Sequence, residues 1–82
     1  MATLRGGLLL YKETATGFIN NINTIFTSTY RFIPGTIIVY LNGLEQTLSE
    51  DYVELSTNTI QFLNPPSGGI DPDIVLFQYQ KA

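Results

Sequence analysis

The sequence contains no cysteine and no histidine among its 82 residues. Disulfide bonds are therefore excluded, together with zinc sites of the usual kind, Ser/His and Cys/His nucleophile pairs and imidazole acid–base chemistry. Charge is also scarce, because charged residues make up 13% of the chain, about half the share of an average soluble domain. An enzyme built from this chain would depend on carboxylates, tyrosine and lysine. We expect a non-enzymatic protein with no catalytic residue, metal or other cofactor.

The chain has too few positive charges to bind an anionic partner by electrostatic attraction. Four lysine and arginine residues stand against seven acidic residues, so the net charge is −3. Such a chain does not neutralise a phosphate backbone or an anionic membrane, and neither nucleic acid nor membrane is an expected partner. The amino terminus has only a three-leucine run, too short for a signal peptide, and no stretch approaches the roughly 18 apolar residues of a membrane span. We expect synthesis in the cytoplasm.

Strand signals dominate what is present, while helical periodicity is nearly absent. Hydrophobic residues make up 44% of the chain, which excludes intrinsic disorder and fits one small domain. Runs rich in β-branched and aromatic residues are separated by turn residues. These runs span residues 24–32, 36–41, 51–55, 59–63 and 73–80. They predict an all-β fold, a small antiparallel sandwich or barrel of immunoglobulin-like size with about five to seven short strands.

Two dipeptides predict specific turns. Pro34-Gly35 suits the centre of a type II turn, since proline fixes φ at the first central position and glycine accepts positive φ at the second. Asn42-Gly43 is the strongest short hairpin signal, because a type I′ turn requires positive φ at both central residues. We therefore expect the chain to fold straight back on itself after residue 41.

Period-two alternation predicts which side chains face the core. Ile37, Val39 and Leu41 fall in one layer, with Ile38 and Tyr40 against another surface. Among the aromatic residues, the predicted core members are Phe26, Tyr30, Phe32, Phe62 and Phe77. The predicted surface aromatics are Tyr40, Tyr52 and Tyr79.

The acidic residues invite a metal-site hypothesis. Glu45, Glu50, Asp51 and Glu54 place four of the seven acids within ten residues. Their spacing fits neither a calcium loop nor the paired carboxylates of a glycosidase. A solvated loop with one turn-capping aspartate is the favoured interpretation.

Residues 1–13 fit the strand scheme less well than residues 14–82, which form the predicted β domain. The first segment is either an arm that pairs with another protein or a plain first strand. Both alternatives stay open at the level of sequence.

An ordered series of short motifs resembles a small β-rich domain of tailed-bacteriophage virion proteins, especially tail-fibre and head- or neck-attached proteins. The resemblance covers about residues 18–80. Its pieces are, in order, Phe26 to Tyr30, Pro34-Gly35-Thr36, Val39 to Gln46, Asp51-Tyr52, Ile60-Gln61-Phe62, Pro65 to Gly68 and Ile74 to Tyr79. The segment Gly69 to Pro72 and the first thirteen residues depart from the pattern.

The resemblance implies a structural role in a virion, as an accessory or attachment component of the capsid, neck, tail or fibre, and carries over no catalytic residue. A carbohydrate- or receptor-binding β-sandwich module is the alternative. Because so small a domain cannot hide its apolar content, we expect assembly with other virion proteins and as a homo-oligomer, with a trimer preferred by analogy with fibre proteins. The candidate interface residues are Leu8, Leu9, Leu10, Tyr11, Ile37, Ile38 and Tyr40.

Overall fold

The described part of the chain forms eight short strands. A computed structural model describes residues 2–5 and 8–82, with side chains from residue 10 onward, and these residues contain no helix. The strands are β1 (Ala2–Arg5), β2 (Leu8–Thr14), β3 (Ile25–Thr27), β4 (Ile38–Leu41), β5 (Leu44–Glu45), β6 (Tyr52–Glu54), β7 (Thr59–Phe62) and β8 (Val75–Gln80).

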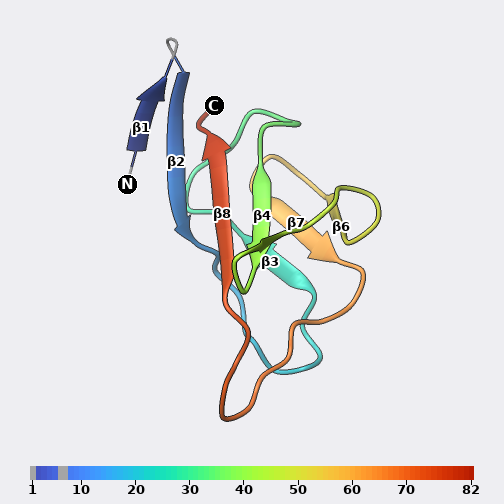
Figure 1. Ribbon diagram of the computed structural model, residues 1–82. Coiled ribbons are helices and arrows are strands. Elements are labelled where there is room, and N and C mark those ends of the chain that lie inside the picture. Colours follow the sequence, from blue (N-terminus) through green and yellow to red (C-terminus); the bar gives the residue numbers. More distant parts are fainter. Residues whose placement is uncertain (1, 6–7) are drawn as a thin grey trace.

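Two antiparallel sheets contain all of these strands (Figure 1). The larger sheet has the order β1-β2-β8-β4-β5 and the smaller one the order β3-β7-β6. The last strand, β8, lies at the centre of the larger sheet, where Phe77 is opposite Glu13 on one side and Val39 on the other. The predicted all-β sandwich is confirmed.

Residues 10–14 of β2 pair with β8. The register runs from Leu10 opposite Gln80 to Thr14 opposite Leu76, so that β2 separates β1 from β8. The sequence left open whether residues 1–13 form an arm or a first strand. The described part of this segment, residues 2–5 and 8–13, is hydrogen-bonded into the larger sheet of its own chain. Removing it would leave β8 with an unpaired edge.

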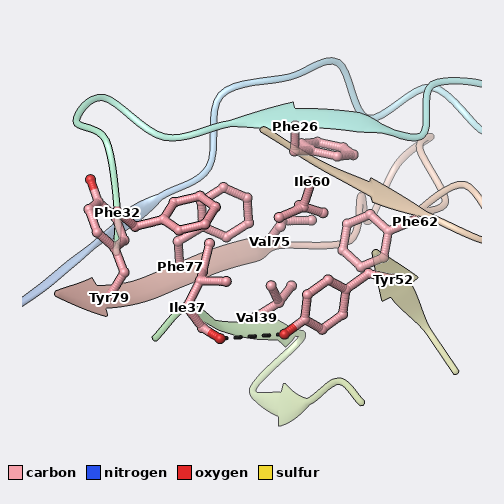
Figure 2. Close-up of a cluster of buried hydrophobic side chains, with 10 residues drawn as sticks. All are labelled: Phe26, Phe32, Ile37, Val39, Tyr52, Ile60, Phe62, Val75, Phe77 and Tyr79. Atoms are coloured by element: carbon pink, nitrogen blue, oxygen red, sulfur yellow. Dashed lines mark hydrogen bonds between the residues drawn. The ribbon is translucent and has the colours of Figure 1, made fainter. Parts of the chain in front are cut away.

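The core lies between the two sheets (Figure 2). It is built from alternate residues on facing strands, as period-two geometry requires. Its buried members are Phe26, Phe32, Ile37, Val39, Tyr52, Ile60, Phe62, Val75, Phe77 and Tyr79. The rings of Phe26 and Phe62 meet edge to face with centroids 5.5 Å apart, a favourable aromatic arrangement.

Both predicted turns are present. Asn42 and Gly43 have φ of 53° and 84°, as a type I′ hairpin requires between β4 and β5. Gly35 has φ of 83°, and the Thr36 amide donates to the Ile33 carbonyl at 3.0 Å, which closes a type II turn over Pro34-Gly35.

Three aromatic predictions are wrong. Tyr52 and Tyr79 were expected at the surface but are 3% and 0% exposed, while Tyr30 was expected in the core and is 45% exposed. The predicted strand 24–32 ends at Thr27, because the Ser28 hydroxyl donates to the Tyr30 carbonyl at 2.5 Å and bends the chain. This bend breaks the alternation before Tyr30. The hydroxyls of the two buried tyrosines donate hydrogen bonds within the protein, Tyr52 to the Ile37 carbonyl and Tyr79 to the Glu13 carboxylate.

Candidate interaction surfaces

Two loops meet at one end of the sandwich, and we call residues 17–24 and 64–74 together the tip. The Asn21 amide donates to the Pro66 carbonyl at 3.2 Å, and the Gly68 amide donates to Asn21 Oδ1 at 3.0 Å. A Cβ on Gly68 would lie 2.4 Å from the Ile19 carbonyl oxygen, so the loops approach as closely as glycine allows. Figure 1 shows both loops at the end of the molecule away from the two termini.

Asparagine side chains fix the first loop of the tip. Asn20 Oδ1 accepts hydrogen bonds from the amides of Ile22 and Asn23, at 3.0 and 2.8 Å. Asn23 Nδ2 in turn donates to the carbonyls of Phe18 and Ile25, at 3.1 and 2.9 Å. These bonds replace regular secondary structure and give the loop one defined path.

Asp73 fixes the second loop and ties it to the β4–β5 hairpin. Its carboxylate accepts hydrogen bonds from Asn42 Nδ2 at 2.8 Å and from the Ser67 amide at 2.7 Å. Asn42 Oδ1 also accepts the Ile74 amide at 2.8 Å. The hydrogen bonds from Asn42 and Ser67 lower the pKa of Asp73, because they stabilise its ionised form.

The tip displays four large apolar side chains to solvent, of which Ile74 is the least exposed at 58%. Phe18, Ile22 and Ile70 are 79%, 80% and 99% exposed. The only charged residues of the tip are Asp71 and Asp73. These positions were not predicted from the sequence; the available signal was a single large apolar residue among turn residues, as in Gly69-Ile70-Asp71-Pro72.

A second candidate surface is the outer face of the larger sheet, opposite the core, where apolar and polar side chains are mixed. Since Phe77 and Tyr79 point into the core, the alternate residues of β8 and their neighbours in register point outward. The outer face includes Leu10, Lys12, Thr14, Ile38, Tyr40, Glu45, Leu76, Gln78 and Gln80. Lys12 Nζ lies 5.5 Å from the centre of the Tyr40 ring.

The predicted interface residues divide between the two sides of the larger sheet. Leu10, Ile38 and Tyr40 share the outer face and are half-buried. Tyr11 and Ile37 lie on the core side, where Ile37 is 5% exposed and Tyr11 packs against Tyr79. Ile37 is therefore a core residue. The side chains of Leu8 and Leu9 lie outside the described residues.

A hydrogen-bonded network crosses the core side of β2 and β8. Tyr79 Oη donates to the Glu13 carboxylate at 2.5 Å. That carboxylate also accepts the Thr29 amide at 2.9 Å and the Thr29 hydroxyl at 2.6 Å. Partial burial raises the pKa of Glu13, but the hydrogen bonds from Thr29 and Tyr79 outweigh it and the pKa lies below its usual value. Burial and the bond to Glu13 raise the pKa of Tyr79, so the phenol keeps its proton and acts as the donor.

Of the four clustered acidic residues, Glu50 and Asp51 lie in the loop between β5 and β6, whereas Glu45 and Glu54 are the last residues of those two strands. Asp51 Oδ2 accepts the Thr47 amide at 2.8 Å, the turn-capping role predicted for one aspartate. Among residues 2–5 and 8–82, no group of three or more acidic side chains could hold a metal ion. The described surface contains no pocket, and the described residues include no helix that could cross a membrane.

Comparisons with protein-family models, curated proteins and solved structures found no match to this chain. The two surfaces and the sequence motifs are therefore the basis for a functional proposal.

Proposed function

We propose that the protein is a non-enzymatic structural component of a bacteriophage virion. It acts by protein–protein assembly, as an accessory or attachment component of the capsid, neck, tail or fibre. The observation that carries the proposal is the tip, where Phe18, Ile22 and Ile70 are exposed on loops held by hydrogen bonds. The ordered motifs between residues 26 and 79 add the virion context.

The tip has the properties of a contact site for another protein. Large apolar side chains exposed together on a small domain mark interaction surfaces, because leaving them in water is unfavourable. The loops are already ordered, so binding requires little additional loss of conformational entropy. The two aspartates and the absence of lysine and arginine from the tip disfavour an anionic membrane and favour a partner whose apolar socket has a neutral or basic rim.

The size of the tip favours several copies acting together. Burying one such side chain contributes about 1.5–3 kcal/mol, so the three most exposed contribute about 5–9 kcal/mol. Association itself costs an estimated 4–15 kcal/mol, roughly the same amount. A single tip is therefore a weak binder, and a homo-oligomer that presents several tips would bind through avidity. The outer face, with Leu10, Ile38 and Tyr40, is the proposed surface for self-association, and a trimer is the preferred state.

The proposal is tested by the protein inventory of the particle. Mass spectrometry of purified particles of the phage that encodes this chain should find it at a fixed ratio to the major capsid protein. The neighbouring reading frames should encode head, neck, tail or fibre proteins. A chain that is expressed during infection but absent from washed particles would exclude the virion role.

A carbohydrate- or receptor-binding module is the second candidate. It is favoured by the place of Tyr40 on the outer face, with the amides of Gln78 and Gln80 on the same face, since sugars stack on aromatic rings and bond to amides. A glycan array with the intact protein separates the two functions. Saturable binding that is lost in Tyr40→Ala would favour the module.

A further inference from the structure

Two tyrosines form an open aromatic corner beside the end of β8. The rings of Tyr11 and Tyr30 are perpendicular, with centroids 5.3 Å apart. The side chain of Lys81 reaches into the corner, where Nζ lies 3.8 Å from the centre of the Tyr30 ring and 4.7 Å from that of Tyr11. We call Tyr11 and Tyr30 the aromatic corner. An ammonium in contact with two ring faces is stabilised by their quadrupoles, more strongly than by one ring.

The aromatic corner is held in place from behind. Tyr79 packs against Tyr11 with ring centroids 5.6 Å apart, and its hydroxyl accepts the Tyr30 amide at 3.3 Å. The Ser28 hydroxyl bonds to the Tyr30 carbonyl, so that both backbone groups of Tyr30 are fixed. Behind Tyr79, the ionised Glu13 adds a negative charge that attracts Lys81. The position of the corner therefore does not depend on Lys81.

The backbone of Lys81 is anchored independently of its ammonium. Lys81 forms a bridge with Phe32, and the neighbouring Ala82 amide donates to the Arg31 carbonyl at 2.9 Å. Only the flexible four-carbon side chain enters the corner, and it can leave without disturbing the strand. Another ammonium group could then occupy the same place.

We propose that the aromatic corner is a binding site for organic ammonium groups, which Lys81 occupies in the free chain. The recognised chemistry is a positively charged nitrogen carrying alkyl groups. A quaternary ammonium headgroup and a lysine of a partner protein both present it. This site is separate from the tip, and its existence does not depend on the virion role.

Removing the Lys81 ammonium should raise the affinity of the aromatic corner for an external ammonium by a predictable factor. Contact of the ammonium with two rings makes the state with Lys81 in the corner about tenfold more populated than the open state, which corresponds to about 1.4 kcal/mol. An external ammonium must displace Lys81 in the wild type but finds an empty corner in Lys81→Gln. We expect apparent affinity for tetramethylammonium to rise by about tenfold in the variant.

The experiment is a titration of both proteins with tetramethylammonium chloride, followed by the NMR resonances of the Tyr11 and Tyr30 rings. Sodium chloride at the same ionic strength and tert-butanol, a neutral compound of similar shape, are the controls. Saturable shifts are expected with tetramethylammonium alone, and Tyr30→Leu in the Lys81→Gln background should abolish them. Equal shifts with tert-butanol, or none beyond those of sodium chloride, would overturn the proposal.

A second measurement uses the wild type, so the test does not depend on the variant folding. At high tetramethylammonium concentration, the methylene protons next to Nζ of Lys81 should lose the upfield shift that the two rings cause. Unchanged Lys81 resonances would contradict displacement. Parallel titrations of Lys81→Gln with choline and with Nα-acetyl-lysine methylamide then assign the source, since the tighter ligand identifies a headgroup or a partner's lysine.

Discussion

Removing the hydroxyl of Tyr79 tests the network that joins β2, β8 and the loop after β3. In Tyr79→Phe the ring keeps its place in the core, where Tyr79 is 0% exposed, and only the polar contacts are lost. The donated bond to the Glu13 carboxylate disappears, and the Tyr30 amide loses its acceptor. A hydrogen bond to a charged group contributes about 1.5–3 kcal/mol, whereas water can reach the amide of the exposed Tyr30. We expect the variant to be less stable by about 2 kcal/mol.

Urea unfolding followed by circular dichroism measures this loss. For a domain of this size, about 2 kcal/mol corresponds to a fall in melting temperature of about 8–16 °C. A double-mutant cycle with Glu13→Gln isolates the pair, and a coupling free energy of about 1–2 kcal/mol is expected. A Tyr79→Phe variant within about 0.5 kcal/mol of the wild type would refute the reasoning, since a part-buried hydrogen bond to a carboxylate is expected to contribute more than that.

Three further predictions concern the turn, the pH dependence and the outer face. Gly43→Val should lower stability by about 1–2 kcal/mol in thermal melts, because φ is 84° there while nothing lies within 4 Å of an added Cβ; an unchanged midpoint would mean the turn is misassigned. Folding lowers the pKa values of Glu13 and Asp73 from their unfolded values of 4.5 and 3.8, so both carboxylates stabilise the fold at pH values above these. This contribution is lost as the pH falls through the lower pKa values of the folded state. Urea midpoints should therefore fall in acid, and less steeply in Glu13→Gln; parallel curves would contradict this. In sedimentation experiments, Ile38→Glu should shift the protein from oligomer toward monomer, while Val53→Glu, on the smaller sheet, should not. The reverse result would place the self-association surface on the smaller sheet instead of the outer face.

Much of the fold could be predicted from local pattern. The Asn42-Gly43 hairpin follows from turn chemistry alone, and the inward placement of Ile60 and Phe62 follows from alternation along one strand. These features depend on residues adjacent in sequence. Alternation also places Tyr79 on the same face as Phe77, so the burial of Tyr79 could have been predicted from the sequence. The buried phenol needs a hydrogen-bond acceptor, however, and only the fold brings that acceptor, Glu13 on β2, next to it.

The candidate surfaces were harder to predict because they depend on contacts between distant segments. The tip requires Asn21 to meet Pro66 and Gly68, more than forty positions away in the chain. The aromatic corner brings Tyr11 and Tyr30 to Lys81 through three separate segments. A single sequence shows the residue types in these places but not their proximity. The candidate list therefore mixed the outer-face residue Ile38 with the core residue Ile37.

The central claim is that the tip attaches this protein to a larger assembly, and one measurement tests it most directly. Ile70→Asp and Leu55→Asp are compared for the amount of chain incorporated into purified phage particles. Both positions are exposed, at 99% and 52%, but Leu55 precedes the β6–β7 turn, outside the tip, and serves as the matched control. The account predicts at least a tenfold loss of incorporation for Ile70→Asp, because a charge buried without a partner costs several kcal/mol, with little change for Leu55→Asp. Equal incorporation of the two variants would contradict it.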